Sequence, residues 1–340
     1  MASYALLVRE SSNRVFGAAA PALAAAELAA ISPHLSIEVT TIDNVEMEGL
    51  PLIRFSGEGL ADLDMFLLSN LALARGAFEM IDDELLRPLP QTPLACFDSD
   101  LVTIQRYQGK TNEQFTHLLV NVALSASRSA HARAAAGERV RVLDPVAGRG
   151  STLNRALVYG FDVAGIEIDS SHVENYKGFL STYLKDRRFK HKITSERIRK
   201  GELAGSVAFE VRFGRDSTVK IPQVHMVRAS TERAAAAFGK GAFDLVVGDL
   251  PYGIHHRAKG TRDKSVEHIE DLVRNSIGAW TAVMRPGASL GLSWNLKRLS
   301  RETLTEIVTD AGWSVVDHER SFEHIVDRQI TRDVLVCVDE

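Results

Sequence analysis

Cysteine and long apolar runs are scarce in this 340-residue chain. Only Cys96 and Cys337 occur, far apart, which excludes a disulfide framework and cysteine-based zinc or iron–sulfur sites. No uncharged apolar run reaches the roughly 18 residues that a membrane span requires, and the first residues do not form a secretory signal. The alanine-rich stretch 18–30 carries Glu27 and contains Pro21. We therefore expect a cytoplasmic protein that does not associate with a membrane.

Lysine is absent from the first hundred residues, and the charge of the chain is unevenly divided. Residues 1–100 hold five arginines and fifteen acids, a net charge of −10. Residues 101–340 hold 35 basic and 29 acidic residues, a net of +6, from totals of 40 and 44. Phosphate binding requires cations, so the first part is not expected to attract nucleic acid by itself.

A glycine-containing loop follows a short apolar run, but it lacks the G-x-G-x-x-G pattern of dinucleotide-binding folds and the Gly-Lys-Ser/Thr of phosphate-binding loops. Residues 140–143 are typical of a buried parallel strand, which Asp144-Pro145 ends. Gly148 and Gly150 allow a sharp turn and a close approach to a ligand. Ser151-Thr152 stands where a helix N-cap is expected. An acid at the head of the loop would repel a pyrophosphate and suits a cationic or amino-acid-bearing ligand.

A second strand is predicted over residues 161–167, and it finishes in an acid, Glu167. Strand, glycine loop, helix, strand and terminal acid together are typical of a nucleotide-binding crossover, in which the acid accepts hydrogen bonds from ribose hydroxyls. An ordinary βα turn is the competing interpretation.

The tetrapeptide Asp249-Leu250-Pro251-Tyr252 closes another apolar run, 243–248. A nucleobase amine is a poor nucleophile because its lone pair is delocalised into the ring, and an enzyme can counter this by accepting both N–H groups. Asp249 offers a carboxylate and Leu250 a backbone carbonyl. Pro251 fixes φ and has no competing N–H, and Tyr252 offers a flat face for a base that has left its helix. Taken alone, the tetrapeptide is also compatible with a strand that ends in a proline turn.

The two motifs together resemble the class I S-adenosylmethionine-dependent amino-methyltransferases, whose fourth motif reads Asp/Asn-x-Pro-Tyr/Phe. Residues 109–116 and 68–79 are similar to segments of one branch, the tRNA (guanine-N2)-methyltransferases. The resemblance covers residues 109–170 and 243–256 best. It implies S-adenosyl-L-methionine as the cofactor. By this resemblance the catalytic residues are Asp249, Leu250, Pro251 and Tyr252, and the cofactor-binding residues are Asp144, Pro145, Ala147, Gly148, Gly150, Ser151, Thr152, Glu167, Ile168 and Ser230.

The third motif of this family usually begins with an acid that contacts the adenine amine, and no acid stands there in this chain. The corresponding stretch, residues 227–231, offers Ser230 or a backbone carbonyl in its place. Tandem His255-His256 has no third ligand at helical spacing, so no metal site is expected.

The resemblance also implies an α/β fold: a Rossmann-like seven-stranded methyltransferase sheet with a smaller N-terminal α+β domain. We assign residues 1–108 to the acidic N-terminal domain, which is interpreted as a structural brace, a protein-docking surface or a degenerate RNA-binding module. Residues 109–340 are assigned to the methyltransferase domain, with a basic insertion at about 184–222. Within the insertion, 207–211 and 219–221 are expected to form a hairpin. At the C-terminus, strands 313–320 and 333–338 are expected to pair at the sheet edge.

Basic residues gather in the insertion and in the loop after Tyr252, where they could hold RNA phosphates. The candidate RNA-binding residues are Lys190, Lys192, Arg197, Arg199, His256, Arg257 and Lys259. We expect methyl transfer to an exocyclic amine of a base in RNA, with guanine N2 in tRNA as the leading substrate and a small activating protein as a further partner implied by some relatives. DNA adenine or cytosine amino-methylation and a non-catalytic methyltransferase-like scaffold remain the alternatives.

Overall fold

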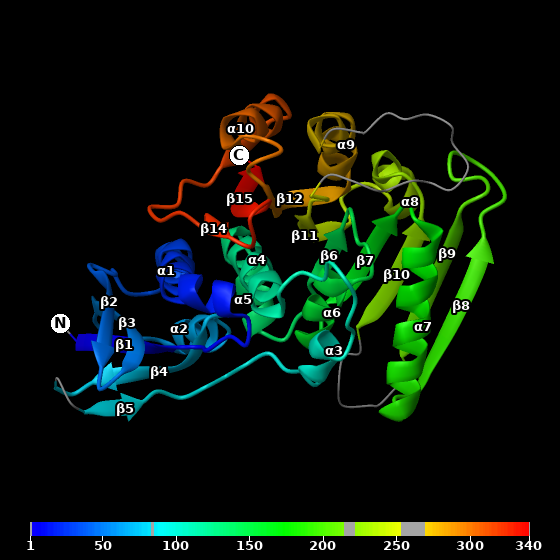
Figure 1. Cartoon of the computed structure of the whole chain (residues 1–340). Coiled ribbons are helices and arrows are strands. Elements are labelled where there is room, and N and C mark those ends of the chain that lie inside the picture. Colours follow the sequence, from blue (N-terminus) through cyan, green and yellow to red (C-terminus); the bar gives the residue numbers. More distant parts are fainter. Residues whose placement is uncertain (1, 83–84, 214–221, 253–268, 340) are drawn as a thin grey trace.

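A computed structural model describes residues 2–82, 85–213, 222–252 and 269–339. Two sheets carry the architecture. The smaller one lies at one end of the molecule, and the larger one extends to strand β8 at the opposite end (Figure 1).

The larger sheet contains ten strands, and its central strands are parallel. Its spatial order is β13-β15-β12-β11-β6-β7-β10-β9-β8, with β14 paired to β15. The strands are β6 (Arg141–Asp144), β7 (Asp162–Glu167), β8 (His191–Arg197), β9 (Val207–Phe213), β10 (Gln223–Arg228), β11 (Phe243–Asp249), β12 (Met284–Asn295), β13 (Trp313–Val315), β14 (His324–Ile325) and β15 (Thr331–Asp339). Seven of them, from β13 to β10, form the predicted Rossmann-like sheet, in which antiparallel β15 lies between β12 and β13.

Helices cover both faces of this sheet because its strands are apolar on both sides. On one face, Val142, Val247 and Val336 pack in a core with α4, α6 and α7. On the other face, Leu143 and Val246 pack in a second core with α9 and α10. The helices and 3-10 turns of this half are α3 (Asp100–Thr103), α4 (Glu113–Ala126), α5 (Ala130–Ala135), α6 (Ser151–Val158), α7 (Ser170–Asp186), η2 (Thr231–Arg233), α8 (Ala234–Phe238), α9 (Ile269–Val283) and α10 (Arg301–Asp310).

The insertion extends the sheet differently from the sequence prediction. Strand β9 pairs antiparallel with β10 on one edge and with β8 on the other. The hairpin partner of β9 is therefore the third parallel-sheet strand itself, not 219–221, of which residue 221 and its predecessors lie outside the described residues. The expected strand 313–320 is also wrong in length, because β13 ends at Val315 and a short β14 lies inside the expected connection.

The smaller sheet is antiparallel, with the order β2-β3-β1-β4-β5. Its elements are β1 (Ala2–Val8), α1 (Arg14–Ile31), η1 (Ser32–His34), β2 (Ile42–Met47), β3 (Leu50–Gly57), α2 (Asp62–Ser69), β4 (Ala74–Met80) and β5 (Leu86–Pro88). The α+β character predicted for this part is confirmed. Its apolar side shares one continuous core with α4 and α6 of the larger half.

Helix α1 is apolar and long enough to cross a membrane by length and composition, yet it packs as a core helix. Ten of its residues are buried, including Glu27. The Glu27 carboxylate accepts hydrogen bonds from the backbone N–H groups of Ala72 (2.8 Å) and Leu73 (3.1 Å) and from Asn121 Nδ2 (2.9 Å). Since Asn121 belongs to α4, this carboxylate joins the two halves of the chain.

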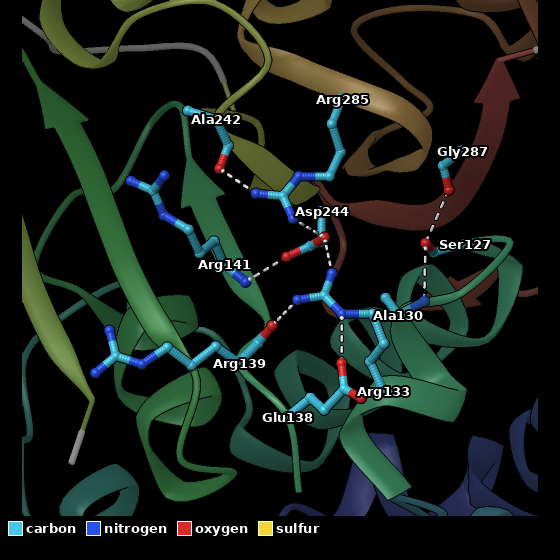
Figure 2. Close-up of polar contacts among 10 residues, drawn as sticks. All are labelled: Ser127, Ala130, Arg133, Glu138, Arg139, Arg141, Ala242, Asp244, Arg285 and Gly287. Carbon is cyan, nitrogen blue, oxygen red and sulfur yellow. Dashed lines mark hydrogen bonds and ion pairs between the residues drawn. The ribbon is translucent and has the colours of Figure 1, made fainter. Parts of the chain in front are cut away.

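A second buried carboxylate fastens the far edge of the large sheet. Asp244, at the start of β11, accepts from Arg133 Nη1 (2.6 Å) and from the backbone N–H of Arg141 (2.7 Å), and it pairs with Arg285 (2.8 Å). Figure 2 shows these arginines converging on Asp244 from α5, β6 and β12. Two cations and a backbone donor satisfy the buried charge, so this cluster is structural. It lies at the N-terminal ends of the parallel strands.

Candidate active site

The glycine loop joins β6 to α6 at the C-terminal edge of the sheet. Gly150 is the N-cap of α6 and has φ +82°, so the cap is a glycine and the prediction of a Ser151-Thr152 cap is wrong. A Cβ at Gly150 would lie 2.3 Å from the Tyr176 ring. Gly150 therefore satisfies both a left-handed backbone and a close approach to an aromatic side chain.

Asp144 ends β6 and is 3% exposed. It accepts hydrogen bonds from the backbone N–H of Val146 (3.0 Å) and from the side chain of Thr152. Burial raises the pKa of Asp144 to about 7, and the nearby carboxylates of Asp249 and Glu167 raise it further. The ends of three neighbouring strands thus place three acids close together.

Glu167 ends β7 and is buried. Its Oε2 accepts from the backbone N–H of Gly148 (2.8 Å) and its Oε1 from that of Asp169 (2.7 Å). His172 Nδ1 lies 3.9 Å from Oε2, and its hydrogen bond with Glu167 raises the pKa of His172. The predicted Ile168 follows directly and is half exposed, which leaves an apolar surface beside the carboxylate.

The other predicted cofactor residues surround the same edge. Ala147 is buried and donates its N–H to Ile166 O (3.1 Å), while Ser151 Oγ lies 2.8 Å from Tyr107 OH. Pro145 approaches Gly248 so closely that a Cβ there would lie 3.3 Å from its ring. Ser230 follows β10, where the preceding Ala229 N–H donates to Glu167 O (3.0 Å). The structure therefore brings all the predicted cofactor residues to the ends of β6, β7, β10 and β11.

Asp249 ends β11, next to β6, and is the centre of a hydroxyl cluster. Its Oδ1 accepts from Ser293 Oγ and Tyr252 OH, and its Oδ2 accepts from Thr111 Oγ1. Leu250, the next residue, is buried, and its N–H donates to Ser293 O (2.8 Å). A carboxylate has about four lone-pair positions. The described residues therefore fill Oδ1 and leave one position on Oδ2.

Tyr252 occupies a different setting from the one expected. Its hydroxyl donates to Asp249 and accepts from Arg332 Nη2, and the Arg332 guanidinium lies 4.8 Å from its ring centre. Burial and the Asp249 charge raise the pKa of Tyr252 well above 10. One ring face is covered, so Tyr252 can stack a base on its other face only, and its hydroxyl has a hydrogen-bonding role that the sequence did not predict.

Four site residues were missed in the sequence: Tyr107, Thr111, Ser293 and Arg332. Thr111 stands inside the 109–116 segment that carries the resemblance, so the signal was present but was not read as a contact to Asp249. Ser293 lies directly opposite Asp249 in the β11–β12 register, which only the strand pairing shows. Arg332 and Tyr107 have no local motif. Burial raises the pKa of Tyr107, and both Asp249 and Asp144 raise it further, which places this phenol near both acids.

The predicted RNA-binding residues divide into two groups. Lys190, Lys192, Arg197 and Arg199 are exposed around β8, at the outer edge of the sheet. Strand alternation puts Lys192 and Arg197 on opposite faces, so the two do not form one continuous surface. His256, Arg257 and Lys259 lie outside the described residues.

The residues at the strand ends fit S-adenosylmethionine by their chemistry. Asp144, Glu167 and Asp249 are three neighbouring acids, and their mutual repulsion contributes to the raised pKa of Asp144. A ligand with a sulfonium and an ammonium group would relieve this repulsion. The Glu167 oxygens each accept one backbone N–H and keep a second lone pair for ribose hydroxyls.

Comparison with known proteins gives distant structural similarities only. No family model matches the sequence, and no curated protein matches it. The chain is similar to the crystal structure of TrmN from Thermus thermophilus, with 17% identity and a TM-score of 0.39 over 68% of this chain and 50% of that one. It thus spans half the length of that protein.

Two further solved structures show the same level of similarity. One is a TehB-like SAM-dependent methyltransferase from Corynebacterium glutamicum, with 11% identity and a TM-score of 0.33 over 59% of this chain and 80% of that one. The other is the 16S rRNA (adenine(1408)-N(1))-methyltransferase from Catenulisporales acidiphilia, with 18% identity and a TM-score of 0.36 over 61% and 89%. The resemblance to S-adenosylmethionine-dependent methyltransferases is confirmed at the level of the fold, for which the strand order of the large sheet is the basis.

Proposed function

We propose that this protein transfers a methyl group from S-adenosylmethionine to an exocyclic amine of a nucleobase in RNA, and that the base is guanine, methylated at N2, in tRNA. One observation carries the proposal. The Asp249 carboxylate stands at the end of β11, held by three hydroxyls, beside the buried acid and glycine loop at the end of β6.

Asp249 and Leu250 would act as the acceptors of the two amine N–H groups. The open position on Oδ2 can accept one of them, and the Leu250 carbonyl can accept the other. Pro251 has no N–H to compete and fixes the backbone between them. Accepting both protons directs the nitrogen lone pair out of conjugation, toward the electrophile, and Asp249 can receive the proton released after transfer.

Bound S-adenosylmethionine would supply an electrophilic methyl group carried by a sulfonium. Asp144 and the loop 145–150 would hold its methionine end, and Glu167 would hold its ribose. Ile168 and Ser230 would contact its adenine, with Ser230 in the place of the acid that the resembling family uses.

The RNA and tRNA parts of the proposal are supported by the basic residues around β8 and by the sequence resemblance of 109–116. The small activating partner and a cytoplasmic location are proposed on the same resemblance. The acidic first hundred residues do not add cations to RNA capture.

Calorimetry and nucleoside analysis test this function directly. The purified protein should bind S-adenosylmethionine, and incubation with unmodified tRNA should yield N2-methylguanosine by mass spectrometry of the digested nucleosides. Asp249→Ala should lose transfer by about a hundredfold or more while cofactor affinity changes little, since this contact is made in the transition state. Methylated adenine or cytosine in DNA would favour the DNA alternative. Absence of cofactor binding would favour the scaffold alternative.

A further inference from the structure

Arg332 is a buried cation behind the tetrapeptide, and it belongs to a strand far from it in sequence. It lies on β15, where its backbone pairs with Asn295 of β12 on one side and with His324 of β14 on the other. The residue is 3% exposed. Pairing on both edges fixes its Cα, so the side chain has a single direction toward the end of β11.

The guanidinium is held between two rings. Its central carbon lies 4.5 Å from the ring centre of Phe115 and 4.8 Å from that of Tyr252. Phe115 is fully buried and follows the Asn112 cap of α4. This three-layer stack defines the plane of the Tyr252 ring from behind and leaves its other face for a ligand.

Arg332 also begins a chain of hydrogen bonds that ends at the acceptor. Its Nη2 donates to the Tyr252 hydroxyl, which in turn donates to Asp249 Oδ1. The same Nη2 lies 3.9 Å from Asp249 Oδ2. His324, the other basic side chain packed against Phe115, is kept neutral because burial lowers its pKa.

The Nε donor of Arg332 is buried and has no hydrogen-bond partner among the described residues. A fold that needed this arginine only for packing would satisfy all its donors or use an apolar residue. An unsatisfied buried guanidinium is better explained by a requirement for its charge and its planar shape at this position.

We infer that Arg332 is a positioning residue of the transfer site, which orients the Tyr252 ring and, through the Tyr252 hydroxyl, the Asp249 carboxylate that accepts the target amine. This inference rests on the proposed function. Its role is indirect, because Tyr252 and Asp249 stand between Arg332 and the substrate. Displacing an acceptor by about 1 Å can cost about a hundredfold in rate.

The test is a double-mutant cycle on kcat, with tRNA and S-adenosylmethionine as substrates. Arg332→Met and Arg332→Lys should each lower kcat by about ten- to a hundredfold, with less than a threefold change in KM for tRNA and in cofactor affinity. Lysine should not restore the rate, because an ammonium neither stacks between two rings nor bridges as a planar fork. Tyr252→Phe combined with Arg332→Met should lower kcat little beyond the worse single variant, since both act through one hydroxyl.

Arg301→Met is the matched control. Arg301 pairs with Asp333, the neighbour of Arg332 on β15, at 2.5 Å, and it does not contact Asp249 or Tyr252. This variant should lose thermal stability to a similar extent and keep kcat. A wild-type level of kcat in folded Arg332→Lys, or multiplicative losses in the double variant, would overturn the inference while the proposed function stands. A wild-type protein that binds cofactor and methylates no RNA would overturn the proposed function and this inference with it.

Discussion

Asp144→Asn should make the protein more stable at neutral and alkaline pH, although it removes a cofactor-binding acid. Burial raises the pKa of Asp144 from 3.8 to about 7. Between these values the folded protein retains a proton that the unfolded chain has released. The stability therefore falls as the pH rises through this window, and the loss is complete above the folded pKa.

The size of the effect follows from the two pKa values. Ionising Asp144 in the folded state costs about 1.7 kcal/mol at pH 5 and about 4 kcal/mol at pH 8. Asparagine has no charge to bury, so the free energy of unfolding of Asp144→Asn relative to wild type should improve by about 2.5 kcal/mol between these pH values. The amide oxygen can still accept from the Val146 N–H, so that contact cancels in the comparison.

Urea unfolding at pH 5, 6, 7 and 8, without added cofactor, measures this difference. Asp310→Asn, at the exposed end of α10, is the control for replacing a surface carboxyl group. A gap between Asp144→Asn and wild type that stays constant across the four pH values would refute the reasoning. Cofactor affinity should behave in the opposite way: a cationic ligand favours ionised Asp144, so wild-type affinity should rise with pH up to about 7.

Four further outcomes are expected. Gly150→Ala should lose about 2 to 5 kcal/mol in urea unfolding, since it combines a left-handed φ with ring overlap, whereas Gly137→Ala, with φ +67° and open space around it, should lose only about 1 kcal/mol. Glu27→Ala should lose about 3 to 5 kcal/mol because it leaves buried donors unpaired. Tyr252→Phe should lose at least about tenfold in kcat, and full activity would mean that stacking alone matters. RNA affinity measured against salt concentration should fall and lose a slope of about 0.7 to 0.9 per phosphate contact when four cations are reversed in charge: Lys190, Lys192, Arg197 and Arg199.

The order of the parallel strands and the acids at their ends could be predicted because each signal is local. An apolar run that stops at Asp144, Glu167 or Asp249 indicates both a strand and its polar end, and parallel strands bring those ends to one edge. The partners of Asp249 could not be predicted in this way. Ser293 reaches it through register, and Arg332 reaches it because β15 lies beside β12. No spacing in the chain encodes either neighbour.

The insertion shows the same limit in another form. Its basic composition and its β-branched runs indicate strands, but a single sequence does not say which edge they join. Strand β9 has β10 as one neighbour and β8 as the other, so the insertion lengthens the sheet and does not stand apart as a separate hairpin. Lys192 and Arg197 consequently lie on different faces.

The acidic N-terminal half is best understood through the segment that joins it to the site. Gln114 Nε2 donates to Glu10 O (2.9 Å), and Asn121, two turns further along α4, bonds to Glu27. The same segment sends Thr111 to Asp249 and places Phe115 against Arg332. Both contacts depend on where α4 begins, and α4 shares its core with the N-terminal sheet. Of the three interpretations of this half, the structural brace accounts for its negative charge, because a brace that positions α4 needs no affinity for phosphate.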